Sequence, residues 1–286
     1  MPFGTDLDNQ FAAETSSITG TVNEQKLFEA LDRSFSNLAA ISPTKCKVIH
    51  GARNLVKFSE KSPSQQFYYA KDRGKAVKCE LADLLLITVD DKEMRICCLQ
   101  NKFEKKKTSG MAITDSFKAD MRQFYLLNVR PLYERKGITS NLLKDAICPS
   151  VGSYGVFYSN SGAYNMNYHS AEILSKVNPT TTGRACKVHM NPAVPQLAYY
   201  PTPAGTVSEW RYTGNILEFG NGLERMQIGT PLPLQTGIIE LADPDILDAI
   251  TNLTNMSDVL ASELRTTISI ANPSVSYRTA IIIKCS

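Results

Sequence analysis

The sequence predicts an α/β fold with a mixed central sheet that is flanked by helices and followed by a C-terminal α+β extension. Two neighbouring strands are indicated by the apolar runs LLLITV (84–89) and ICCL (96–99), which are hydrophobic on both faces as central strands are. Apolar residues at helical spacing precede this hairpin in residues 23–35 and follow it in residues 115–133. Helical segments on both sides of buried strands are typical of α/β proteins.

The composition is that of an ordinary globular protein with one large domain or two small ones: 286 residues, 43% hydrophobic and 21% charged. The formal net charge of +3 is far below that of a strongly basic nucleic-acid-binding domain, so partners have to be inferred from local patches. No apolar run approaches the ~18–20 residues of a membrane span, and the polar, acidic N-terminus is not a secretory signal. The seven cysteines form no CxxC pair, which predicts free, mostly buried thiols and a cytoplasmic location.

The elements before the hairpin are a loose arm, a helix and short strands. Residues 1–20 are rich in Ser, Thr, Asp and Asn, which predicts a flexible arm. The helix at 23–35 can be capped by either Thr21 or Asn23. Short β-like pieces at 45–58 and a loop at 59–66 then lead to the hairpin.

The elements after the hairpin are, in chain order, an amphipathic helix at 115–133, a short helix at 141–147, a strand at 153–159, a short helix at 170–177, loops and short strands at 180–237, a helix at 244–265 and a final strand at 277–285. We therefore divide the chain into an arm (1–20), a core (21–178) and a C-terminal extension (179–286). The sequence does not decide whether the extension is a separate domain.

Polar residues end both strands of the hairpin on one face. A two-residue loop at Asp91-Lys92 and a four-residue loop from 90 to 93 give the same register. In that register Asp83 lies opposite Gln100, with Cβ atoms about 5 Å apart, and Lys102 is next along the same face. The simplest alternative is that these residues are the solvent-exposed ends of a hairpin, but polar residues at the ends of central strands are where open α/β sheets build sites.

An Asp and a Gln on adjacent strands can hold a hard divalent cation through their side-chain oxygens. The backbone carbonyl of Asn101 can be a further ligand, and Lys102 can stabilise the negative charge that develops on a scissile phosphate. The pattern therefore indicates metal-assisted hydrolysis of a phosphodiester bond.

The spacing of Asp83 and Gln100-Asn101-Lys102 resembles the PD-(D/E)xK nuclease superfamily, in particular the branch with Gln in place of the second acid, as in Mrr-like restriction endonucleases and related antiphage effector nucleases. The resemblance covers roughly residues 20–160. It implies a restriction-endonuclease-like fold and a DNA endonuclease that acts in bacterial antiphage defence or restriction. It also implies Mg²⁺ as cofactor, with Mn²⁺ as a substitute.

The first helix of this superfamily often supplies a Glu to the metal site, for which Glu24 is favoured over Glu29. The chain departs from the superfamily pattern in having no Pro before Asp83. Since Gln100 is neutral, Glu80 or Glu24 would have to compensate for the missing charge, and Glu80 can equally be a solvent-facing residue before the strand.

Lysines lie on both sides of the motif, at Lys75, Lys78, Lys105, Lys106 and Lys107. We expect them to hold the phosphate backbone of double-stranded DNA, although such charge runs are commonly solvated loops. Phe67, Tyr68 and Tyr69 can stack on bases or belong to the core. The three histidines (His50, His169, His189) are not at metal-ligand or triad spacing and are predicted to be structural or surface residues.

Two other function classes remain open. One is an inactive relative that binds nucleic acid or a partner protein, and the other is an assembly protein that acts through its C-terminal region. For the nuclease, the resemblance implies a homodimer or a sensor, ATPase or helicase partner.

Overall fold

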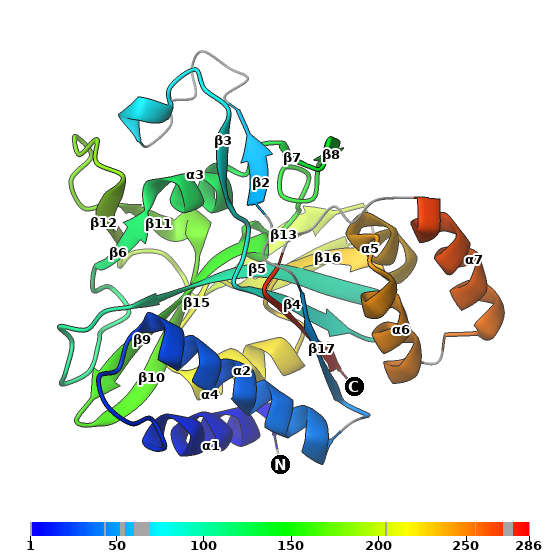
Figure 1. The fold of residues 1–286 in the computed structure, drawn as a ribbon, viewed down its shortest axis with the longest axis horizontal. Coiled ribbons are helices and arrows are strands. Elements are labelled where there is room, and N and C mark those ends of the chain that lie inside the picture. The colour runs from blue at the N-terminus through cyan, green and yellow to red at the C-terminus, as the bar shows by residue number, and fades with distance from the viewer. Residues whose placement is uncertain are drawn as a thin grey trace.

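The computed structural model describes residues 2–42, 44–51, 55–59, 69–203, 205–254, 256–270 and 277–285. The fold is mixed α/β, as predicted, around an eight-stranded sheet (Figure 1). Its strand order is β1 (Cys46–His50), β17 (Thr279–Lys284), β4 (Leu84–Val89), β5 (Glu93–Phe103), β9 (Gly152–Asn160), β10 (Ala163–Ser170) and β15 (Tyr212–Thr213), with β16 (Thr230–Pro233) also paired to β5. The sheet is mixed because β17 pairs with β4 and β5 pairs with β9 in parallel, whereas the other pairs are antiparallel.

Helices cover both faces of this sheet (Figure 1). On one face lie α1 (Phe3–Ser16), α2 (Glu24–Ile41) and α4 (Ile216–Glu224), and on the other lie α3 (Met121–Val129), α5 (Leu234–Leu241) and α6 (Pro244–Leu253), with α7 (Asp258–Ile270) packed on α5 and α6.

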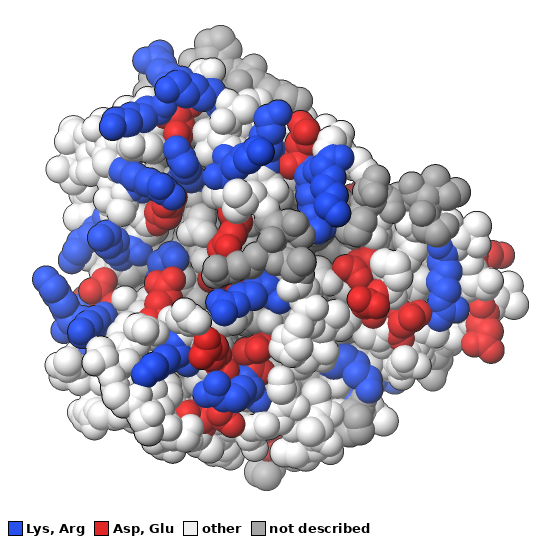
Figure 2. All heavy atoms as spheres, viewed as in Figure 1, with Lys and Arg blue, Asp and Glu red and all other residues white. Residues whose placement is uncertain are grey.

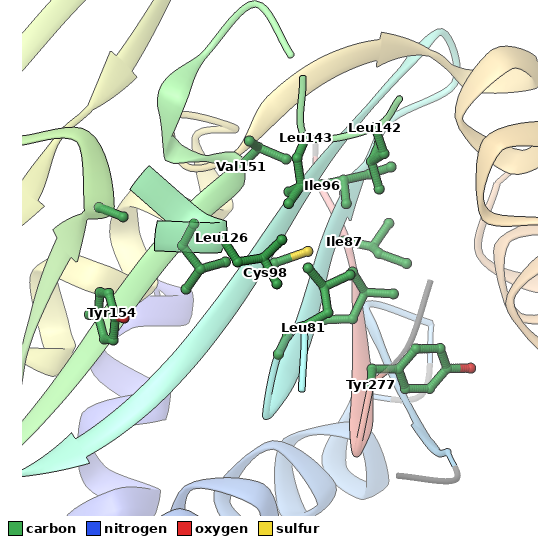
Figure 3. Packing of buried hydrophobic residues seen from close by; sticks show 14 of the residues in the cluster. Leu81, Ile87, Ile96, Cys98, Leu126, Leu142, Leu143, Val151, Tyr154 and Tyr277 are labelled. Atoms are coloured by element: carbon green, nitrogen blue, oxygen red, sulfur yellow. The ribbon is translucent and has the colours of Figure 1, made fainter. Parts of the chain in front are cut away.

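The hairpin strands contribute to both cores by simple alternation. Leu85 and Ile87 join the core under α3, whereas Leu84 and Leu86 join the core under α1 and α2. Figure 3 shows Ile87 together with Ile96 and Cys98 of β5 in the first of these cores. The prediction that both faces of these strands are buried is confirmed.

Smaller sheets surround the main one. One consists of β3 (Val77–Glu80), β2 (Leu55–Phe58), β7 (Tyr133–Arg135) and β8 (Ile138–Ser140) in that order, another of β11 (Leu174–Lys176), β12 (Ala185–Met190) and β6 (Phe117–Asp120), and a third of β13 (Leu197–Thr202) and β14 (Gly205–Trp210). Short 3₁₀ turns occur at Ala70–Asp72, Pro149–Val151 and Ala171–Ile173.

The N-terminal segment differs from its prediction. Most of the expected loose arm is helix α1, in which Leu7 and Phe11 are buried. Phe3, Leu7 and Phe11 are four residues apart and so lie on one helical face, a signal that the polar composition around them obscures.

Several later elements also differ. The expected helix at 115–133 begins only at Met121, because residues 117–120 pair with β12 as β6 and the Asp120 side chain accepts a hydrogen bond from the Arg122 N–H. The segment 141–147 forms turns without a named helix, and 170–177 is a 3₁₀ turn followed by β11. The stretch 180–237 contains helix α4 and the first half of α5, and the helix expected at 244–265 is divided into α6 and α7.

The C-terminal strand lies inside the main sheet. The predicted final strand is confirmed as β17, and it pairs with β1 on one side and β4 on the other. The extension 179–286 therefore supplies a central strand next to the hairpin. All seven cysteines are free, as predicted, and all but Cys79 are buried. Within the described ranges, no helix is long and apolar enough to cross a bilayer.

Helices α1 and α4 cross at glycines, and this crossing generates a stability prediction. A Cβ on Gly220 would lie 2.6 Å from the Gly4 Cα, closer than side chains can pack. We therefore expect Gly220→Ala to destabilise the protein by about 1–3 kcal/mol, although Ala is the better helix former. Urea unfolding measures the effect. Gly183→Ala, where the nearest atom is 3.7 Å away, is the control and should change stability by less than about 0.5 kcal/mol; equal effects of both substitutions would contradict the close crossing.

Candidate active site

The hairpin has the predicted register. Strands β4 and β5 pair Leu84 with Leu99 and Val89 with Met94. The connection is a tight turn, in which the Asp90 carboxylate accepts hydrogen bonds of 2.7 Å from the N–H groups of Lys92 and Glu93. A tightly closed turn determines the register, which in turn determines what lies at the opposite end of the strands.

Asp83 is the centre of the site. It precedes β4 directly and is 7% exposed. Its Oδ2 accepts a short hydrogen bond from Gln100 Nε2 and a second bond of 2.8 Å from the backbone N–H of Asn101. Among the described residues no hydrogen bond reaches Oδ1. Asp83 thus meets Gln100 as the register predicts, and the bond from the Asn101 N–H is an addition that the sequence did not predict. Within the described part of the chain, one carboxylate oxygen is left over.

The backbone around Asp83 is held on both sides. The Asp83 N–H donates to the Leu99 carbonyl, and its own carbonyl accepts from the Thr279 N–H of β17. The carboxylate therefore comes from a segment that is fixed between β5 and the C-terminal strand, which gives it a defined position.

Burial raises the pKa of Asp83 to about 6, and the nearby charges of Glu80 and Glu24 act in the same direction. The Asn101 N–H and the ammonium group of Lys102 oppose this rise. A half-buried acid at the end of β3, Glu80, is thus close enough to Asp83 to affect its ionisation. A buried carboxylate with further acids nearby is an environment that a cation would stabilise.

The backbone carbonyl of Asn101 faces the same space as Asp83. In a β-strand the N–H and C=O of one residue point to the same side, and the Asn101 N–H points at Asp83. Strand β4 pairs with β5 only as far as Leu99, so no β4 residue covers this carbonyl. The Asn101 side chain belongs to the opposite face, where Gly155 is its neighbour and its buried amide atoms have no hydrogen-bond partner among the described residues.

Lys102 and Glu24 form an ion pair beside Asp83. The distance from Lys102 Nζ to Glu24 Oε1 is 3.2 Å, and the Lys102 side chain is 14% exposed. Glu24 is the first residue of α2, which is capped by Asn23 through a 2.9 Å bond from the Lys26 N–H. Of the two predicted capping residues, Thr21 and Asn23, the structure shows Asn23 as the cap.

Glu29, the alternative to Glu24, is occupied elsewhere, because it accepts a hydrogen bond from Gln25 on the exposed side of α2. The structure therefore brings Glu24 to the motif.

Sequence reasoning missed Gln123 of α3, whose Nε2 donates a 2.9 Å hydrogen bond to Gln100 Oε1. The helix after the motif was expected, but no sequence pattern shows which of its polar residues faces the strand ends.

The assembled groups suit a hard cation. Asp83, Gln100, the Asn101 carbonyl, Glu24 and Glu80 all offer oxygen atoms, which Mg²⁺ and Mn²⁺ prefer. No group of three or more His, Cys, Asp or Glu residues suited to a metal occurs in the part of the chain that the structure describes. The cluster around Asp83 offers instead one carboxylate, whose Oδ1 accepts no hydrogen bond from the described residues, and the Asn101 carbonyl on the same side, while the Gln100 amide oxygen faces Gln123. These two oxygens would fit such an ion.

The predicted DNA-binding lysines lie on two different segments. Lys75 and Lys78 are exposed at and before β3, in the small sheet, whereas Lys105 and Lys106 are exposed on the loop after β5. Lys107 pairs with Asp115 at 2.7 Å. On the face in Figure 2, Lys and Arg gather toward the top and left with acidic residues among them. A role for these lysines in binding DNA stays a prediction.

Of the remaining candidates, His169 and Tyr69 make packing contacts. His169 is fully buried, and burial lowers its pKa to about 3, so it is a neutral core residue as expected. Tyr69 is half-buried, and the guanidinium of Arg122 lies 5.7 Å from the centre of its ring. Phe67, Tyr68 and most of the predicted loop at 59–66 lie outside the described residues.

No protein-family model, curated protein or solved structure matches this chain. The interpretation of the site therefore rests on its own geometry.

The buried Asp83 predicts a pH-dependent stability. Because its pKa rises from 3.8 to about 6, the folded protein retains a proton that the unfolded chain loses, and stability falls as the pH rises through this window. Without divalent cations, Asp83→Asn should remove this penalty and stabilise the protein at pH 7–8 by up to about 3 kcal/mol, with the gain vanishing toward pH 4. Urea unfolding across this pH range measures it. The exposed Asp145→Asn is the control, and a gain that does not depend on pH would contradict the assignment.

Proposed function

We propose that this protein is a metal-dependent endonuclease that hydrolyses DNA phosphodiester bonds, with a restriction-endonuclease-like core of the PD-(D/E)xK type. The observation that carries the proposal is the contact of Asp83 with both Gln100 and Asn101 at the open end of a central hairpin, with Lys102 next along the strand.

The order of elements around the hairpin supports this proposal. Helix α2 precedes the hairpin and supplies Glu24, β4 and β5 carry the motif, and α3 follows and leads on to β9, which is parallel to β5. This is the sequence of helix, motif-bearing mixed sheet and further helix that the resemblance implies.

The residues have distinct roles in the proposed reaction. Asp83, Gln100 and the Asn101 carbonyl would hold the cation, with Glu24 or Glu80 supplying the second negative charge that Gln100 lacks. A bound Mg²⁺ or Mn²⁺ polarises a phosphoryl oxygen and lowers the pKa of water. The Lys102 ammonium, restrained by Glu24, is the group that stabilises charge developing on the scissile phosphate.

Binding of the duplex is assigned to the lysines on either side of the motif, through the phosphate backbone. We place the protein in the cytoplasm, where free cysteines persist, and in bacterial defence or restriction, acting as a homodimer or with a sensor, ATPase or helicase partner.

One observation favours a second candidate, a catalytically inactive nucleic-acid- or partner-binding protein. Gln100 donates its amide N–H to Asp83, so the protein itself already satisfies part of the carboxylate that a cation would need. Cleavage and metal binding distinguish the two candidates.

Plasmid cleavage tests the proposal. We expect the wild type to cut supercoiled plasmid with Mg²⁺ or Mn²⁺, and both Asp83→Ala and Lys102→Ala to lose about 10²-fold or more of the rate, since each removes a group that acts in the transition state. Lys92→Ala, at the turn end of the same hairpin, should cut like the wild type. An active Asp83→Ala would rule out the proposed site, and a folded wild type that does not cleave any DNA substrate with either ion would rule out cleavage by this chain without a partner.

The lysine assignment predicts a change in salt dependence. Replacing Lys105 and Lys106 by Gln should weaken duplex binding in the absence of divalent cations. It should also reduce the slope of the logarithm of the association constant against the logarithm of the salt concentration by about 2. The matched control replaces Lys92 and Lys144, which are exposed elsewhere. Fluorescence anisotropy at several salt concentrations measures both variants, and equal slopes for the two would contradict the role of the 105–107 loop.

A further inference from the structure

We propose that Gln123 is a positioning residue that controls which end of the Gln100 amide faces Asp83, so that binding of a divalent cation requires the two amides to rotate together. This inference rests on the proposed metal site and concerns its regulation by a residue of α3.

The present orientation of Gln100 opposes cation binding. An amide has a donor end and an acceptor end. The acceptor, Oε1, receives the hydrogen bond from Gln123, whereas the donor, Nε2, points at Asp83 Oδ2. A cation at Asp83 would meet the NH₂ group of Gln100, which repels it, while the oxygen that could be its ligand faces α3.

Rotation of the terminal amide by half a turn exchanges the two ends of Gln100. Such terminal torsions are broad and roughly two-fold, so both orientations fit the same space. After the rotation, Oε1 faces the Asp83 side and Nε2 faces Gln123. If Gln123 kept its orientation, two NH₂ groups would then face each other.

Gln123 can relieve this conflict because its own side-chain amide also has a donor end and an acceptor end. By turning its own amide, it presents Oε1 to the Gln100 NH₂ and restores a hydrogen bond. Gln100 is only 2% exposed, so water cannot readily replace this partner. A glutamine at position 123 therefore suits both states, whereas a carboxylate, which only accepts, suits the cation-bound state alone.

The helix that carries Gln123 is firmly placed. The neighbouring Arg122 makes two hydrogen bonds of 2.7 Å to Asp72, which is 4% exposed. Asp120 caps the helix, and the Met121 N–H donates to the Arg184 carbonyl at 2.7 Å. Since the backbone is held here, we assign the adjustment to the side chain of Gln123 rather than to a shift of α3.

Calorimetric titration with Mg²⁺ establishes the site and measures the effect of residue 123. Wild type should bind Mg²⁺ and Asp83→Asn should not. Gln123→Glu should bind about tenfold more tightly, because its carboxylate accepts from the Gln100 NH₂ and holds Oε1 toward Asp83. In a Gln100→Glu background no rotation is needed, so Gln123→Glu should increase the Mg²⁺ affinity clearly less than it does in the wild type. Gln123→Met, of similar length, removes the bond from both states and should change the affinity by less than about twofold.

NMR of the glutamine side-chain amides gives a second readout, which a merely structural role would not change. The NH₂ signals of Gln100 and Gln123, assigned with the Gln100→Glu and Gln123→Met variants, should shift together with the same dependence on Mg²⁺. In Gln100→Glu the Gln123 signal should move much less, although the cation is equally near, because its amide keeps donating to the carboxylate.

Two outcomes would overturn the inference in distinguishable ways. If Mg²⁺ binds in an Asp83-dependent manner but the Gln123 signal stays still, or if Gln123→Glu gains equally in both backgrounds, the paired rotation is refuted and the metal site stands. If the wild type shows no Asp83-dependent binding of Mg²⁺, the proposed function and this inference fail together.

Discussion

The hydrogen bonds from Gln100 and Asn101 to the buried Asp83 carboxylate are the interaction on which the rest of the site depends. They join the start of β4 to the far part of β5, and they position the only buried carboxylate of the hairpin among the described residues. Around this contact the remaining groups follow from strand geometry: Lys102 is two residues further along β5, and the Asn101 carbonyl shares the side on which its N–H meets Asp83.

The unequal length of the two strands creates the space for this site. Strand β5 has 11 residues and β4 has 6, so β5 continues past the end of its partner. Beyond that end β5 is paired on one side only, with β9, while the other side offers backbone groups to the site. The parallel neighbours β17 and β9 keep both strands in the interior of the sheet, so this end of the hairpin is not a frayed edge.

The same arrangement carries a cost in stability. A carboxylate at a buried position, whose pKa is raised by burial and by the nearby Glu80 and Glu24, is electrostatically unfavourable even with the ammonium group of Lys102 close by. Such strain is expected where groups are preorganised for a ligand, because residues selected only for stability would be uncharged at this depth. The proposed cation would relieve this strain. In its absence, the Gln100 amide donates a hydrogen bond to Asp83 and accepts one from Gln123.

The sequence by itself determined the local features. The register of the hairpin follows from the tight turn at 90–93 and from apolar alternation, and it was enough to place Asp83 opposite Gln100. The helix at Glu24 follows from its cap and apolar spacing, whereas α1 was missed because its apolar face is spread through a polar segment.

Only the tertiary structure decided the contacts between distant segments. Nothing local indicates that Gln123 reaches Gln100, that Glu24 pairs with Lys102, or that the last strand of the chain lies beside β4. Each depends on how helices and strands far apart in the chain pack against one another, and sequence periodicity specifies the buried face of an element but not its neighbour.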